Sequence, residues 1–379
     1  MRQFCRSGNN LLNQTMKRTV VIILLSILFA YAETAGSDLP VMGLCIAAPG
    51  HDYLKEFDRF IREDLAPLGI NTLVLRVDWA YEYETHPELR DENALTKHDV
   101  KLLVKTCKEL NINLIPHINL LGHQSWASHV NRLLEVYPEF DETPWVKMPA
   151  DYKWPNDDGL YCKSYCPLHP DVHKILFDVI GELVDVFEAK AFHAGMDEVF
   201  YIGDSKCPRC SGRDKAELFA GEVNLVHNFL ASKGGQMWIW GDRLIDGKTT
   251  SYGMWEASMN NTYRAIDMIY KDVVICDWHY ERPDLSPVLF ALKGFTVITC
   301  PWRTPEVALR QLDNTMMFIA TATRETRDRY AGILQTDWGS ADKFVSDFRE
   351  IKSSGITPAG KEKSAANTLY QLTRKTREE

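Results

Sequence analysis

The sequence has no excess of positive charge and no nucleotide-binding loop, and these absences narrow its class. Its 43 lysines and arginines are outnumbered by 52 aspartates and glutamates, which gives a formal charge of -9 and a pI near 5.7. This balance disfavours binding to nucleic acid or to an anionic membrane surface. No Gly-x-Gly-x-x-Gly or Walker-type loop follows a predicted strand, which disfavours a nucleotide-binding fold.

The apolar run near the N-terminus is too short for an ordinary membrane span. It begins at Thr19 and is about 14 residues long. The basic stretch Met16-Lys17-Arg18 precedes it, and Ala30-Tyr31-Ala32 gives the small-x-small pattern of a cleavage site. We therefore expect residues 1–32 to hold an extension and a signal peptide, with Met16 as an alternative start, in a secreted or periplasmic protein without stable membrane insertion. An uncleaved N-terminal anchor is the other interpretation.

Cysteine is scarce, with nine residues in the chain, and its positions form two groups. Four lie in apolar strand-like or helix-like settings and are interpreted as buried small hydrophobes, namely Cys45, Cys107, Cys276 and Cys300. Four further cysteines lie in polar loops, in the motifs Cys162-x3-Cys166 and Cys207-Pro208-Arg209-Cys210. In an exported protein these four predict two disulfides, and a structural zinc site is the alternative.

The sequence does contain a repeated alternation of strands and helices. Strand-like runs recur along the chain, separated by segments of helical periodicity, at 41–48, 72–78, 113–119, 191–199, 237–244, 273–280, 296–303 and 332–338. This alternation predicts parallel strands, and eight of them predict an α/β fold, a closed (β/α)8 TIM barrel. We place this domain at 33–353, with a long site-shaping loop after the third strand and a poorly ordered polar tail, holding at most one surface helix, at 354–379.

Tryptophan and charged side chains gather at the predicted strand ends. Barrel enzymes carry their chemistry at the C-terminal ends of the strands. Buried carboxylates cost stability unless they are paired, so stability alone does not explain so many of them there. Tryptophan faces stack on pyranose rings, whereas Asp, Arg and His bind their hydroxyls. The sequence therefore predicts a carbohydrate pocket.

The run Phe192–Val199 is the most informative of these strand ends, because two adjacent carboxylates, Asp197 and Glu198, follow a short apolar strand. Alternation places Met196 on the helix-covered face and Gly195 on the polar face, where a glycine indicates that another group approaches the backbone closely. Two carboxylates this close cannot both ionise cheaply, so one pKa should rise toward the range of a general acid. The alternative is a pair that merely caps the following loop.

At this point the motifs resemble a known family. His193-x-Gly195-x-Asp197-Glu198 resembles the His-x-Gly-Gly-Asp-Glu signature of glycoside hydrolase family 20, the β-N-acetylhexosaminidases. The stretch 115–123 is similar to that family's Pro-Glu-x-Asp-x-Pro-Gly-His strand, and 335–339 is similar to its final strand, which ends in a pocket tryptophan. The resemblance extends over residues 41 to 340.

The resemblance implies a retaining mechanism in which the substrate's own 2-acetamido group is the nucleophile. Glu198 would be the acid and base, and Asp197 would orient the acetamido group. No metal or cofactor is expected, and the partner is an oligosaccharide or glycoconjugate. The predicted substrate-binding residues are Arg76, His123, His193, Trp240, Asp242, Trp255, Asp277, Tyr280 and Trp338.

Four departures from the family pattern leave the choice of sugar open. Met196 replaces the second glycine, Asn119 replaces an aspartate, and Ser340 replaces a carboxylate. The family's first-strand arginine has no counterpart, although Arg76 is a candidate replacement. Two other hypotheses stand beside the hexosaminidase. One is a two-carboxylate glycosidase that pairs Glu198 with Asp242 or Asp277, and the other is a sugar-binding barrel without turnover.

Overall fold

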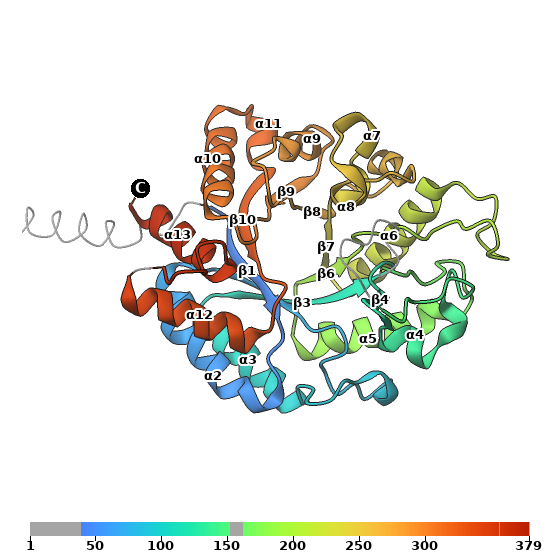
Figure 1. Ribbon diagram of the computed structural model, residues 1–379, viewed down its shortest axis with the longest axis horizontal. Helices are drawn as coiled ribbons and strands as arrows, with labels where there is room; N and C mark the ends of the chain where they lie inside the picture. Colours follow the sequence, from blue (N-terminus) through green and yellow to red (C-terminus); the bar gives the residue numbers. More distant parts are fainter. Residues whose placement is uncertain (1–38, 152–161, 356, 379) are drawn as a thin grey trace, which may run out of the picture. The chain divides into compact units, whose positions relative to one another are not determined.

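Eight parallel strands close into a barrel in the order β1-β10-β9-β8-β7-β6-β3-β2. In Figure 1 these strands lie at the centre, and the helices surround them. The predicted (β/α)8 barrel is confirmed, with a strand in each predicted segment. The strands are β1 (Val41–Ala47), β2 (Thr72–Arg76), β3 (Asn113–Leu120), β6 (Ala191–Gly195), β7 (Gln236–Trp240), β8 (Val274–Asp277), β9 (Thr296–Thr299) and β10 (Tyr330–Thr336).

The computed structural model describes residues 39–151, 162–355 and 357–378. The predicted signal segment at 1–32 lies outside these ranges and stays a prediction. Within them, no helix has both the length and the apolar character that a membrane crossing requires. The helices are α2 (Leu54–Phe60), α3 (Lys97–Glu109), α4 (Arg132–Val136), α5 (Val172–Val186), α6 (Lys215–Ser232), α7 (Gly247–Thr250), α8 (Gly253–Glu256), α9 (Ser286–Leu292), α10 (Pro305–Thr321), α11 (Arg324–Arg327), α12 (Ala341–Ser354) and α13 (Ala365–Glu378).

Local side-chain chemistry sets where the longer helices begin. Thr96 caps α3. Its hydroxyl accepts a hydrogen bond from the Asp99 amide, and the Asp99 carboxylate accepts one from the Thr96 amide. Asp214 caps α6 by accepting from the amides of Ala216 and Glu217. Such caps satisfy amides that have no partner within the helix, and each contributes about 1 kcal/mol.

The core has two layers because alternate residues of each strand face opposite sides. On β7, Met237 and Ile239 pack outward against the helices, whereas Trp238 and Trp240 fill the barrel interior. All four cysteines interpreted as small hydrophobes are buried. Cys45, Cys276 and Cys300 lie inside the barrel, and Cys107 lies in the outer layer.

Two segments differ from expectation in their detail. The long connection after β3 carries structure of its own, namely the hairpin of β4 (Ser125–Trp126) and β5 (His129–Val130), followed by α4. The expected poorly ordered tail is instead largely helix α13. Its residues Ala365, Ala366, Leu369 and Leu372 join the outer core, so apolar burial orders a segment whose overall composition is polar.

Candidate active site

The chain turns sharply where β6 ends, and this turn presents Asp197 and Glu198. The strand stops at Gly195, earlier than predicted, and Gly195, Met196 and Glu198 have φ angles of 67°, 70° and 49°. Met196 is buried in the outer core, on the helix-covered side as predicted. The predicted close approach is also present, because a Cβ added at Gly195 would lie 2.3 Å from Asn119 Oδ1. Residues other than glycine rarely have a positive φ, so the backbone of this turn is strained at Met196 and Glu198.

His123 joins the two carboxylates. Its Nε2 atom lies 3.1 Å from Asp197 Oδ2 and 3.1 Å from Glu198 Oε2, and the three side chains are 15%, 7% and 13% exposed. Burial disfavours the charged imidazole, but the Asp197 carboxylate outweighs it and raises the pKa of His123 well above its usual value. A protonated His123 therefore lies between two carboxylates and keeps them close together.

Cys162 is a contact of the site that the sequence did not reveal. Its thiol donates to Glu198 Oε2 at 3.2 Å, and its sulfur lies 3.6 Å from His123 Nδ1. Burial raises the pKa of this thiol, so it stays neutral and acts as a donor. The prediction that grouped Cys162 with the other loop cysteines is wrong, because the loop folds back and brings it to Glu198 instead.

Asp242 holds the backbone that carries Glu198. Its Oδ2 atom accepts from the Glu198 amide at 3.0 Å and from Arg243 Nε at 2.5 Å, and its Oδ1 atom accepts from Trp278 Nε1 at 3.3 Å. Burial raises the pKa of Asp242 to about 6, against the opposing effect of Arg243 and with a further rise from Asp197. Protein donors therefore contact both oxygens of Asp242, and one of them is the backbone amide of Glu198.

Arg243 is a second residue that sequence reasoning missed. It is fully buried, and besides Asp242 its guanidinium donates to the carbonyl oxygens of Met254, Trp255 and Ala257. These bonds fix the segment that carries the predicted pocket residue Trp255, whose ring packs edge-on against Phe200 at 4.9 Å. The signal was the arginine directly after a strand-end aspartate, where a buried charge needs a partner.

Asp277 has its contacts in the loop that follows β8. It is 2% exposed at the end of β8, and its Oδ2 atom accepts from the Ser286 hydroxyl at 2.6 Å. His279 Nε2 lies 3.5 Å from its other oxygen. These contacts support the loop after β8.

Aromatic side chains continue from the barrel floor to the opposite side of the mouth. Trp240 is fully buried, 4.3 Å from the His193 ring and 5.6 Å from the Trp338 ring between centroids. Trp338 Nε1 donates to the Tyr280 hydroxyl at 3.0 Å, and the Arg76 guanidinium lies 4.9 Å from the Trp338 ring. Five predicted residues therefore form one connected row.

His193, at one end of this row, packs against a second histidine, His117. His193 and His117 are fully buried with ring centroids 4.8 Å apart, and the Gly195 amide donates to His193 Nδ1 at 3.2 Å. Burial lowers the pKa of His117 well below its usual value, and His193 adds to that effect. This buried histidine pair thus supports the turn at Gly195.

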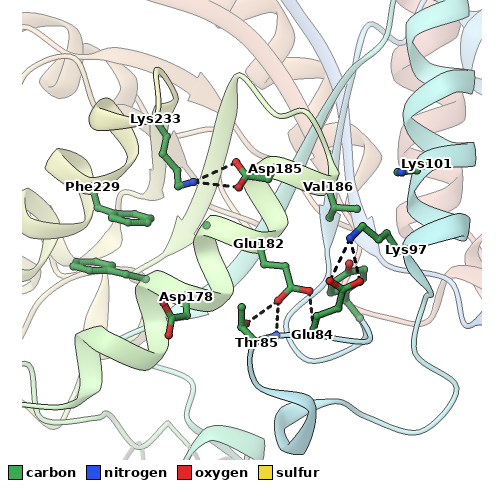
Figure 2. Close-up of a pocket in the computed structure, with 13 residues that line it drawn as sticks. Glu84, Thr85, Lys97, Lys101, Asp178, Glu182, Asp185, Val186, Phe229 and Lys233 are labelled. Atoms are coloured by element: carbon green, nitrogen blue, oxygen red, sulfur yellow. Dashed lines mark hydrogen bonds and ion pairs between the residues drawn. The ribbon is translucent and has the colours of Figure 1, made fainter.

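Two cavities differ in their relation to these residues. A cavity of about 200 Å³ adjoins the site, with Asp78, Asn119 and His123 in its wall. Another, of about 620 Å³, lies outside the barrel, and Figure 2 shows its lining. There Lys97 pairs with Glu84, and Lys233 pairs with Asp185. None of the strand-end residues lines this second cavity, so its size does not make it the catalytic centre.

Comparison with known proteins agrees with this geometry. The family model for the glycosyl hydrolase family 20 catalytic domain matches residues 74–308. The chain therefore belongs to glycosyl hydrolase family 20, as the motifs predicted.

The chain is also similar to other known proteins. A lacto-N-biosidase of Bifidobacterium bifidum is 28% identical over 205 residues, which are 51% of this chain and 17% of that protein. A β-hexosaminidase of Akkermansia muciniphila is 34% identical over 119 residues, 31% of this chain and 22% of that protein. The matches thus span about a fifth of the length of these relatives.

Solved structures support the fold. The chitobiase of Flavobacterium johnsoniae superposes with a TM-score of 0.60 at 18% identity, covering 90% of this chain and 51% of that one. An exo β-N-acetylglucosaminidase of Vibrio harveyi, solved with N-acetylglucosamine, gives a TM-score of 0.58 at 16% identity, covering 90% of this chain and 57% of that one.

Proposed function

We propose that this protein is a β-N-acetylhexosaminidase that releases terminal β-linked N-acetylhexosamine with retention of configuration. The observation that carries the proposal is the convergence of Asp197 and Glu198 on one nitrogen of His123, 3.1 Å from each, at the C-terminal end of the barrel. Neighbouring carboxylates on one side of a site suit substrate assistance, because an enzyme nucleophile would have to face the acid across the sugar.

The two carboxylates have different surroundings, and these support different roles. Asp197 Oδ2 pairs with His123, whereas its Oδ1 atom is buried and has no hydrogen-bond partner among the described residues. A buried oxygen without a donor is costly, and the N–H of a 2-acetamido group would satisfy it. Glu198 is held by the Cys162 thiol and through its own amide by Asp242, which suits the residue that exchanges a proton.

The reaction follows from these positions in two steps. The acetamido carbonyl oxygen attacks C1 while Glu198 gives its proton to the leaving glycosidic oxygen, so the C1–oxygen bond breaks and an oxazolinium ring forms. Asp197 stabilises the positive charge on that ring through its N–H. Glu198, now ionised, then takes a proton from water as the water oxygen bonds to C1, and the ring reopens to the acetamido group.

The aromatic row supports the sugar-binding part of the proposal. The Tyr280 hydroxyl accepts its hydrogen bond from Trp338, so its own proton can be donated to the acetamido carbonyl. Trp240, Trp255 and Trp338 supply apolar faces for the acetamido methyl and the ring. Arg76 would bind hydroxyls on the far side of the sugar.

The wider proposal covers compartment and substrate class. The basic start, apolar run and cleavage pattern at 16–32 support a secreted or periplasmic protein. Its catalytic domain, predicted at 33–353, would also include α13, which joins the outer core. Its substrate would be an oligosaccharide or glycoconjugate. The protein donors on Asp242 and Asp277 give no support to a two-carboxylate glycosidase.

A panel of aryl β-glycosides tests the proposal on the purified protein. We expect turnover of the N-acetylglucosaminide or N-acetylgalactosaminide and little or none of the matched 2-hydroxy glycosides, which lack the nucleophile. Equal rates on the glucoside and the N-acetyl sugar would contradict the mechanism. So would a 2-fluoro sugar that becomes covalently attached to a protein carboxylate, and complete inactivity would favour a binding barrel.

A further inference from the structure

A group of buried thiols and one carboxylate lies outside the catalytic pair. Its members are Glu142, Cys166, Cys207 and Cys210, called here the thiol–carboxylate cluster. Their ligand atoms all lie within 4.8 Å of one another, and each residue is at most 2% exposed. The sulfur of Cys166 is 3.7 Å from that of Cys207 and 3.4 Å from that of Cys210.

Two loops assemble this cluster from distant parts of the chain. The segments around Asp141 and Tyr165 pair in antiparallel fashion, with the Glu142 amide bonded to the Ser164 carbonyl and the Cys166 amide bonded to the Phe140 carbonyl. Cys207 and Cys210 come from the loop after β6, where the backbone amides of Arg209 and Cys210 are directed at the Cys207 sulfur. A Cys-x2-Cys turn of this kind is typical of metal-binding loops.

Glu142 has one carboxylate oxygen that needs a cation or a hydrogen-bond donor. Its side chain is fully buried, and its Oε1 atom accepts from the Asp204 amide at 3.0 Å. Its Oε2 atom has no hydrogen-bond partner among the described residues. The Lys163 ammonium forms an ion pair with Asp141 at 2.5 Å and donates to the carbonyls of Thr143 and Val146, so its hydrogen bonds go to groups other than Glu142. A buried carboxylate oxygen of this kind needs a cation or a donor.

A disulfide would not meet this need. It would use two of the three sulfurs and leave the third beside a buried carboxylate with an unpartnered oxygen. A single metal ion would use all four side chains, and three sulfurs with one oxygen at tetrahedral spacing suit zinc, which accepts both thiolate and carboxylate ligands. We propose that Glu142, Cys166, Cys207 and Cys210 bind one zinc ion as a structural site.

The cluster lies where two loops next to Asp197 and Glu198 meet. One loop also carries His123 and Cys162, and the other continues directly from Asp197 and Glu198. Zinc would therefore fasten together the two loops that surround the catalytic carboxylates. The sequence-based alternative of a zinc site is thus revised, because Glu142 takes the place of Cys162. This inference does not rest on the proposed hexosaminidase activity.

Metal content of the full chain tests the inference whether or not the protein is active. We purify it without a histidine tag and measure metals by plasma mass spectrometry, expecting about one zinc per chain. Cobalt exchanged into the wild type should give thiolate-to-cobalt charge-transfer bands and the intense d–d bands of a tetrahedral site. Cys210→Ser and Glu142→Ala should lose stoichiometric zinc, whereas Cys107→Ser, a buried thiol on α3, should retain it.

Several outcomes would overturn the inference. One is a wild type without metal whose intact mass is two hydrogens lower and whose digest joins Cys166 to Cys207 or Cys210. Another is zinc that survives Cys210→Ser but is lost in Cys162→Ser, which would place the ion at His123, Cys162 and Glu198. If Cys210→Ser does not fold, the cobalt spectrum of the wild type decides, since a spectrum without thiolate bands contradicts the site.

Discussion

The two sides of the barrel mouth differ in how firmly the protein holds its functional side chains. On the side of β3, β6 and β7, His123 bridges both carboxylates, Cys162 donates to Glu198, and Asp242 holds its amide. On the side of β10, β1 and β2, the contacts are sparser. Arg76 donates one hydrogen bond of 3.2 Å to the Gly339 carbonyl and lies over Trp338, and its Nε is buried with no hydrogen-bond partner in the part of the chain described.

The same division separates matches to the family pattern from departures. The Asp-Glu pair and the Gly-His loop lie on the firmly held side. The missing first-strand arginine and Ser340, which stands where the family has a carboxylate, lie on the other, and Ser340 is the N-cap of α12. If the proposed function holds, this difference predicts that bond cleavage and sugar choice are specified by separate regions. The first can be preserved while the second changes.

The largest expected effect comes from Glu198 on the firmly held side. Glu198→Gln keeps the shape but cannot give up a proton, so we expect kcat/KM to fall about 10² to 10⁴-fold for glycosides with poor leaving groups. The loss should be much smaller for activated aryl leaving groups, which need no acid. Steady-state kinetics on both substrate types measure this. Glu182→Gln, a carboxylate on α5 outside the barrel mouth, is the control and should leave both rates unchanged.

Equal losses of Glu198→Gln on good and poor leaving groups would mean that Glu198 is not the acid. Unchanged rates on both would remove it from the mechanism.

Asp197 should show a smaller effect on the same side. A thiazoline mimic of the cyclic intermediate should bind the wild type far more tightly than the product sugar does, because it carries the shape and charge of the transition state. Asp197→Asn should weaken that binding by about 10 to 100-fold, since a charge-assisted hydrogen bond to the ring N–H is worth about 1.5–3 kcal/mol. Calorimetry measures both affinities. Unaltered thiazoline binding would rule out this role for Asp197.

The fold was predictable because its signals are local and repeated. Each strand segment is a short apolar run, and the helices between them keep a 3.6-residue period, so the count of eight strands was sufficient. The exception was α13, whose polar composition hid four core residues on one face. Periodicity, not mean polarity, was the relevant signal there.

The site was predictable only where residues stand at strand ends. The sequence placed Asp197, Glu198, Trp240 and Trp338 at strand ends, and the structure brings Asp197 to Glu198 and Trp240 to Trp338, because position on a barrel strand fixes position in space. Cys162 and Glu142 come from the long loop after β3, and nothing in their spacing says which partner the loop will bring them. The contacts of Asp242 with Arg243 and Trp278 could not be predicted either, since they depend on tertiary packing.

On the side of β10, β1 and β2, substitutions of Arg76 test whether this region binds the sugar. If it replaces the missing sugar-gripping arginine, Arg76→Gln should raise KM about tenfold with little change in kcat, because it removes binding shared by ground and transition states. Arg76→Lys should fall in between, since it keeps the charge but loses the planar fork and part of the stacking on Trp338. Kinetics on the N-acetylglucosaminide and its 4-epimer would show whether the loss depends on one hydroxyl. A fall in kcat instead would assign Arg76 to the catalytic side.

The smallest expected effect on activity belongs to His279, which lies on neither side. Its ring pairs with Glu256 at 2.7 Å and lies 3.5 Å from Asp277, and although burial opposes the charge, these carboxylates raise its pKa from 6.5 to about 9. A raised histidine pKa stabilises the fold fully below the unfolded value of 6.5 and loses that contribution as the pH rises through about 9. Denaturant unfolding between these two pH values should therefore show a falling free energy of unfolding, with at most about 1.4 kcal/mol per pH unit from this one proton.

His279→Gln should flatten that slope and leave kcat nearly unchanged, whereas His98→Gln, a change at an exposed histidine on α3, should keep the slope. The same steep slope in both variants would show that another group titrates there, and a large loss of kcat would tie the loop after β8 to the catalytic side.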